Sequence, residues 1–170
     1  LLSASSVSAI GSLGFNLGVK RNSDGQCKET SDFTTDFKDM AAYTNIIRVY
    51  AMSDCNTLQN LGPALEESGF KAFLGIWPND DAHFAAEKAA LEAYLPSMSV
   101  SNVIAFTVGS EALYREDMTA TELASKISDI KDFVANIKDK DGNSYGSIPV
   151  GTADSWNVLV DGGSKPAIEA

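Results

Sequence analysis

Apolar and polar positions follow a repeating order along the chain: a short apolar run, a polar loop, then an amphipathic segment. The apolar runs occupy residues 13–19, 45–51, 70–77, 103–109 and 148–154. The second and fourth are rich in β-branched residues, which strands prefer. We therefore expect five strands, each running into a loop or a helix.

The segments between these runs have the spacing of helices. Apolar residues at 33, 37, 40 and 41 form one helical stripe, and those at 123, 127, 130, 134 and 137 form a longer one. Thr119 and Glu122 match a capping box at the start of the longer helix, and Gly142 with Asn143 supplies turn chemistry after it. Within residues 56–68 we expect a turn and then a helix that begins at Pro63, because Pro suits the first helical position.

Strand–helix alternation at this spacing predicts βαβ units and an α/β fold with a parallel sheet. Two architectures share this pattern. One is an open doubly wound sheet, and the other is a (β/α)8 barrel, of which this chain would hold the first five strands. A complete barrel normally needs about 250 residues. Residues 164–170 are typical of a helix rather than of a natural finish, so both ends of the chain look cut.

The fourth run leads directly into an acidic residue. Side chains alternate between the two faces of a strand, so residues 103, 105, 107 and 109 would form a small face and residues 104, 106 and 108 a bulky one. The bulky face suits packing against helices, and the small face suits a crowded interior. Glu111 falls on the small face at the carboxyl end, where parallel α/β folds build their active sites. It is a candidate general acid or base, with an exposed loop acid as the alternative.

Aromatic residues follow four of the five expected strands, at Tyr50, Trp77, Tyr114 and Trp156. Sugar rings present apolar C–H faces that stack on such side chains, so this pattern favours a carbohydrate cleft. The alternative for the two tryptophans is core packing.

Cleavage of a glycosidic bond needs one protonated carboxyl and a second carboxylate. Glu111 suits the first role. Polar companions stand nearby. Asp154, at the end of the fifth strand, is a candidate substrate-binding residue, and Asn16 and Arg48 are on strand faces suited to the interior. The alternative for Asp154 is a helix cap.

Composition narrows the choice of partners. The formal net charge is −10, from 13 basic and 23 acidic residues. Nucleic acids and anionic membranes are therefore poor partners, since both require clustered Lys and Arg, whereas a neutral substrate is compatible. Residues 1–9 match the tail of a secretory signal, with a short Ser/Ala-rich terminus as the alternative.

Two cysteines and one histidine limit metal chemistry. Cys27 and Cys55 each follow an expected strand, and these strands are neighbours in sequence, so a disulfide is plausible, with two free thiols as the alternative. Without a CxxC pair, a zinc site is not expected. His83 lies in a polar segment that suits a solvated side chain, and dinucleotide, phosphate-loop and serine-hydrolase motifs are absent from the sequence. We expect a site without metal or cofactor.

Six segments together resemble glycoside hydrolase family 17, and in particular its fungal cell-wall β-1,3-glucanase and β-1,3-glucanosyltransferase branch. They are residues 14–20 (GFNLGVK), 47–51 (IRVYA), 53–60 (SDCNTLQN), 75–78 (GIWP), 108–115 (VGSEALYR) and 151–160 (GTADSWNVLV). The resemblance covers residues 10–170. It implies a (β/α)8 barrel whose N-terminal part is this chain, a retaining mechanism on β-1,3-glucan by hydrolysis or transfer, secretion to the cell wall, and a monomer at full length.

The resemblance also implies roles for residues. Glu111 holds the position of the family's acid/base, and Ser110 stands where many relatives have Asn. Tyr50, Trp77 and Trp156 would line the glucan cleft, with Tyr114 beside them. The family's nucleophile is a Glu after strand seven, and this chain holds no counterpart, because Asp154 on the neighbouring strand has poor geometry for attack from the opposite face of the sugar. A non-catalytic glucan-binding or cell-wall structural protein is the alternative if 170 residues is the natural length.

Overall fold

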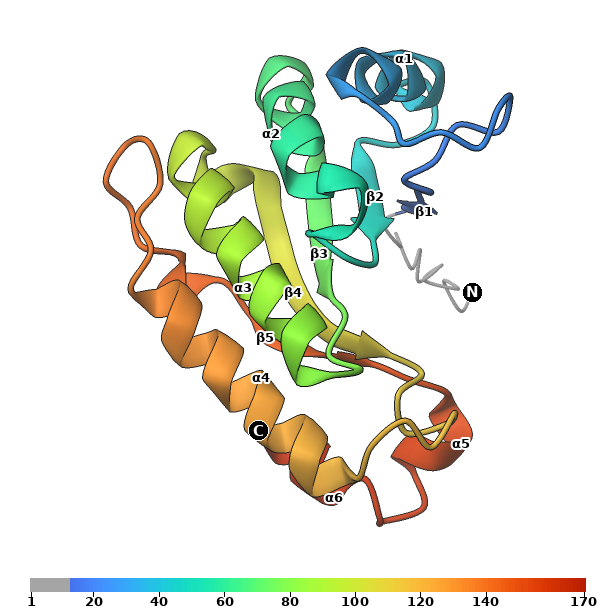
Figure 1. The fold of residues 1–170 in the computed structure, drawn as a ribbon, viewed down its shortest axis with the longest axis vertical. Helices are drawn as coiled ribbons and strands as arrows, with labels where there is room; N and C mark the ends of the chain where they lie inside the picture. The colour runs from blue at the N-terminus through green and yellow to red at the C-terminus, as the bar shows by residue number, and fades with distance from the viewer. Residues whose placement is uncertain (1–12) are drawn as a thin grey trace, which may run out of the picture.

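The computed structural model describes residues 13–170 (Figure 1). The segment 1–9, interpreted above as a signal remnant, lies outside the described residues. The strands are β1 Phe15–Asn16, β2 Ile46–Val49, β3 Lys71–Ile76, β4 Val103–Ser110 and β5 Val150–Ala153. The longer helices are α1 Thr30–Met40, α2 Thr57–Ser68, α3 Asp81–Tyr94 and α4 Ala120–Ala135. The short ones are η1 Asp54–Asn56, η2 Leu95–Ser97, η3 Val100–Asn102, η4 Tyr145–Ser147, α5 Trp156–Leu159 and α6 Lys165–Glu169.

The sheet decides between the two architectures. Its strands are all parallel and lie in the order β1-β2-β3-β4-β5, without the reversal that a doubly wound sheet contains. Because crossovers between parallel strands are right-handed, strands added always on the same side bring every connecting helix to one face. Figure 1 shows α1 to α4 following one another along that face. This is the arrangement of the first five strands of a (β/α)8 barrel, as the sequence predicted.

The core lies between the sheet and these helices. Phe33 and Phe37 of α1 are buried, and the Phe37 ring stacks on Phe70 at 4.4 Å between centroids. The long apolar stripe packs as expected, with its first four members buried on α4. The Thr119–Glu122 capping box is present, which confirms the expected start of this helix.

The prediction that α2 begins at Pro63 is wrong. The helix begins at Thr57 and contains Pro63 in its interior, although Pro there removes a hydrogen bond and costs about 3 kcal/mol. Its buried face explains the tolerance. Leu58, Leu61 and Leu65 are fully buried against the core, and helices in proteins are stabilised mainly by such packing.

The two faces of β4 follow the prediction only beyond a bulge. Ala72 pairs with Val103 but Phe73 pairs with Ala105, so Ile104 is an extra residue in β4. As a result Val103 packs into the core and Ile104 lines the open inner face, the reverse of the expectation. After the bulge, Phe106 is buried in the core and Thr107 lines the inner face, as predicted.

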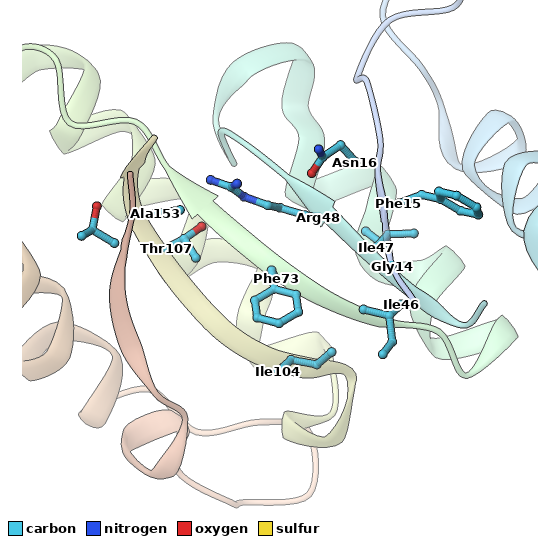
Figure 2. A pocket seen from close by; sticks show the side chains of 11 residues that line it. Gly14, Phe15, Asn16, Ile46, Ile47, Arg48, Phe73, Ile104, Thr107 and Ala153 are labelled. Atoms are coloured by element: carbon cyan, nitrogen blue, oxygen red, sulfur yellow. The ribbon is translucent and has the colours of Figure 1, made fainter. Parts of the chain in front are cut away.

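The inner face of the sheet is a hollow lined by all five strands (Figure 2). Phe73, Ile104 and Ile46 lie toward the amino ends of the strands, whereas Arg48 and Asn16 lie toward the carboxyl ends. The face therefore changes from apolar to polar along the strand direction, and its polar end adjoins the site described below.

Cys27 and Cys55 form a disulfide across a sequence separation of 28 residues. The bond joins the segment after β1 to η1, which follows β2. It is the pairing that the positions of the two cysteines suggested. No helix among residues 13–170 is long and apolar enough to cross a bilayer.

Candidate active site

A polar hollow of about 490 Å³ opens at the carboxyl ends of the strands. Each strand end contributes to it. Its lining comprises Asn16, Arg48, Tyr50, Trp77, Ser110, Glu111, Arg115, Ala153 and Asp154. Five of the residues proposed from the sequence, Tyr50, Trp77, Ser110, Glu111 and Asp154, thus meet in one place.

Glu111 reaches this hollow through a turn rather than through strand alternation. β4 ends at Ser110, after Gly109 takes a φ of +77°, and Glu111 itself has a φ of +56°. Its backbone N–H donates to the Ala153 carbonyl at 2.8 Å. The left-handed conformation is disfavoured for a residue with a Cβ, so contacts from β5 hold it.

Asp154 is tied to the loop that Glu111 begins. Its Oδ2 accepts from the Leu113 amide at 2.8 Å, and its Oδ1 accepts from the amides of Tyr114 at 3.2 Å and Ser155 at 2.7 Å. It does not act as an N-cap of α5, whose N-cap is Ser155. The carboxylate instead joins the ends of β4 and β5.

Two aromatic rings in the lining each contact the guanidinium group of an arginine. The Arg48 guanidinium lies 4.8 Å from the centre of the Tyr50 ring, and that of Arg115 lies 4.8 Å from the Trp77 ring. Arg115 also pairs with Asp117. Arg115 was not predicted from the sequence, because it lies in an irregular loop where no periodicity shows which way a side chain points.

Tyr114 and Trp156 do not line the hollow. Their side chains are 55% and 76% exposed. Both residues are still close to the hollow. The Tyr114 amide donates to Asp154, which lines the hollow, and Trp156 lies two residues after Asp154 in the sequence. They are exposed aromatic surfaces beside the hollow rather than parts of its wall.

His83 is not the solvated side chain that the sequence suggested. It lies in α3, and its Nδ1 is 2.8 Å from Asn79 Oδ1, while its Nε2 is 3.0 Å from Asp54 Oδ1 and 3.3 Å from Glu87 Oε1. The Asp54–His83–Glu87 trio brings together oxygen and nitrogen atoms of the kind that bind metals. This trio was not predicted from the sequence, because Asp54 lies 29 residues from His83.

The hydrogen bonds of Glu87 indicate the role of this trio. It is fully buried, and its oxygens accept from the Met52 amide and from the amide and hydroxyl of Ser53. Burial raises the pKa of the Glu87 carboxyl, while the bonds from Ser53 and Met52 and the nearby His83 oppose this rise. Both carboxylate oxygens are occupied by protein donors, so the trio is a structural link between α3 and the segment after β2.

Three buried polar atoms on or beside the inner face have no hydrogen-bond partner within residues 13–170. They are Arg48 Nε, Thr107 Oγ1 and Thr152 Oγ1. Buried polar groups are normally paired. The polar end of the inner face is thus suited to contact further polar groups.

The model of the family described as glycosyl hydrolases family 17 matches residues 13–170. Among known proteins, glucan 1,3-beta-glucosidase BGL2 of Candida albicans is 67% identical over 165 residues, which cover 97% of this chain and 53% of that protein. A glucan 1,3-beta-glucosidase of Saccharomyces cerevisiae is 60% identical over 167 residues, with 98% and 53% covered.

A solved structure is also similar: an active-site mutant of Rhizomucor miehei beta-1,3-glucanosyltransferase in complex with laminaritriose. Its sequence is 35% identical, the TM-score is 0.70, and the match covers 85% of this chain and 50% of that one. The chain thus spans about half the length of the relatives that it matches.

Proposed function

Since the chain belongs to glycosyl hydrolases family 17, we propose that the whole protein is a retaining enzyme of β-1,3-glucan in the fungal cell wall. It acts as an endo-hydrolase, as a β-1,3-glucanosyltransferase, or as both, and residues 10–170 form the N-terminal part of its (β/α)8 barrel. The observation that carries the proposal is the position of Glu111 at the end of β4, in a polar hollow walled by Tyr50 and Trp77. The names of the glucan 1,3-beta-glucosidases and of the laminaritriose complex support the substrate class.

In this mechanism Glu111 is the acid/base. It protonates the departing glucosyl oxygen and later removes a proton from water, or from a sugar hydroxyl when the product is a longer glucan. Its side chain is exposed in the hollow and its backbone is anchored to β5, so it can reach a bound sugar from a defined position.

The second carboxylate of a retaining pair must lie about 5–5.5 Å from the first. Asp154 is a poor candidate, because three backbone amides already bind its oxygens. The position of Arg48 supports a second carboxylate that comes from outside residues 13–170. Arg48 forms no ion pair with the described residues and lines the same hollow, and a cation there stabilises an incoming carboxylate.

The glucan is proposed to bind along the aromatic side chains. Tyr50 and Trp77 would stack on sugars inside the hollow, while the exposed Tyr114 and Trp156 would contact units farther along the chain. Ser110 lines the hollow next to Glu111 and offers a hydroxyl to the substrate. The protein is proposed to work outside the cell as a monomer, and the Cys27–Cys55 disulfide suits that oxidising environment.

Glu111→Gln in the full-length enzyme tests the proposal. General acid–base catalysis contributes about 100-fold to about 10,000-fold, so kcat on laminari-oligosaccharides should fall by a factor in that range while their Kd is unchanged. Glu116→Gln is the matched control, since Glu116 is an exposed acid of the same loop that does not line the hollow. Undiminished hydrolysis and transfer by the Glu111 variant would overturn the assignment.

A further inference from the structure

The first part of the loop that begins at Glu111 is held by Ala153, the last residue of β5, and by Asp154, which follows it. The Glu111 amide donates to the carbonyl of Ala153, and the amides of Leu113 and Tyr114 donate to the carboxylate of Asp154. The Asp154 carboxylate also accepts from its own neighbour, Ser155. Two consecutive residues at the end of β5 thus anchor the first part of this loop.

The loop also closes backbone hydrogen bonds of its own, from the amides of Arg115, Glu116 and Asp117. The attachment to β5 still matters, because these bonds do not make the backbone conformation of Glu111 a favourable one. Glu111 and Glu116 both have φ values near +57°, at +56° and +58°, in a region that residues with a Cβ rarely adopt. Such conformations persist where surrounding contacts determine them. Asp154 supplies two of these contacts, since its carboxylate accepts from the Leu113 and Tyr114 amides of the loop.

The same bonds leave the Asp154 carboxylate little capacity to act as a nucleophile or to bind a sugar. Each carboxylate oxygen accepts a backbone N–H, and Oδ1 accepts two. A carboxylate so occupied is a weak nucleophile and has few lone pairs left for a sugar hydroxyl. Its contribution is therefore to geometry.

We propose that Asp154 is a positioning residue, which acts on the reaction by holding the Glu111 turn so that the Glu111 carboxyl meets the departing oxygen. This inference rests on the proposed acid/base role of Glu111. It differs from the substrate-binding role that the sequence suggested for Asp154, and the two roles have different kinetic consequences.

The experiment compares two substrates in the full-length enzyme. A laminari-oligosaccharide has a sugar alkoxide as its leaving group and needs protonation, whereas a 2,4-dinitrophenyl β-laminaribioside has a leaving group stable enough to depart without an acid. Because kcat/KM reports the step in which the leaving group departs, a displaced Glu111 lowers kcat/KM only on the first substrate. The later base-assisted step is common to both substrates and affects kcat alone. A misplacement of about 1 Å can cost about 100-fold, so Asp154→Ala should lower kcat/KM on the oligosaccharide by about that factor. We expect the KM of this variant for the oligosaccharide to remain near that of the wild type. Its kcat/KM on the aryl glycoside should also be unchanged.

Asp154→Asn is the conservative variant. It keeps one acceptor oxygen but turns an NH₂ group toward a backbone N–H, so its loss should fall between those of the wild type and Asp154→Ala. If Asp154→Ala does not fold, Asp154→Asn decides the question by the same comparison of substrates.

Asp139→Asn is the matched control. Asp139 also accepts three backbone amides, from Val100, Asp141 and Asn143, but it lies at the opposite end of the sheet, since η3 with Val100 precedes β4. This variant should lose stability and keep wild-type kcat/KM on both substrates.

Three results would overturn the inference. An equal loss of kcat/KM on both substrates would indicate general structural damage. A raised KM with unchanged kcat on the oligosaccharide would indicate that Asp154 binds the sugar. Wild-type kinetics would indicate that Asp154 has no role in the reaction. Glu111→Gln measured in parallel separates the two proposals. If it also lacks the leaving-group dependence, the proposed function fails; if it shows the dependence and Asp154→Ala does not, only the positioning role fails.

Discussion

Gly75 of β3 lies against the backbone at the end of β2, and its replacement by Ala should damage both fold and site. A Cβ at this position would stand 2.5 Å from the Val49 carbonyl oxygen and 2.6 Å from two backbone atoms of Tyr50. Favourable contacts between heavy atoms are about 3.5–4.0 Å, so the strands would have to separate by roughly 1 Å. Because the colliding atoms are backbone, they cannot rotate away. We expect Gly75→Ala to lower the free energy of unfolding by about 3 kcal/mol, the upper part of the usual range for overpacking.

The measurement is urea unfolding of the full-length protein, followed by circular dichroism, together with glucan hydrolysis. Gly151→Ala is the control, because a Cβ on that β5 residue would meet no atom of residues 13–170 within 4 Å. This control should change stability by less than about 0.5 kcal/mol. The Gly75 variant should also lose activity, since Tyr50 lines the hollow beside the forced separation. Equal stability of the two variants would refute the reasoning.

Two further predictions concern stability. Cys27→Ser opens a link across 28 residues, and the chain-entropy relation gives a loss of about 3.5 kcal/mol; thermal unfolding with and without a reductant checks it, and a reductant should not destabilise the variant further. The backbone amides of Val100 and Asn143 lower the pKa of Asp139 from 3.8 to about 2, so its carboxylate stabilises the folded state above its unfolded pKa and this contribution is lost as the pH falls through about 2. The difference in unfolding free energy between wild type and Asp139→Asn should therefore shrink from pH 6 to pH 2, and a constant difference would contradict it.

Local signals in the sequence were enough for the order of elements and for the longest helix. Each apolar run became a strand, and the Thr119–Glu122 pair marked the start of α4 correctly because a capping box is complete within four residues. The same kind of local rule failed at Pro63, where burial of α2 against the core outweighed the preference of Pro for a helix start.

The site was predictable at the level of strand ends and not at the level of side-chain direction. Glu111 belongs to a strand end that the apolar run identified, but its left-handed backbone depends on Ala153 and Asp154, some 40 residues later. The bulge at Ile104 likewise depends on how β4 pairs with β3. Alternation along a single strand contains neither piece of information, since both arise from contacts between strands.

The charges in the hollow suggest how one site can keep two carboxylates in different states. Asp154 is bound by three amides and Arg115 is paired with Asp117, so both are already engaged within the described residues. Arg48 and Glu111 are the charged lining groups without such a partner there. Two carboxylates at about 5 Å repel, and one of them must hold a proton unless a cation stabilises the other. Under the proposed mechanism, Arg48 is therefore the cation available to the second carboxylate, while Glu111 delivers the proton to the departing sugar.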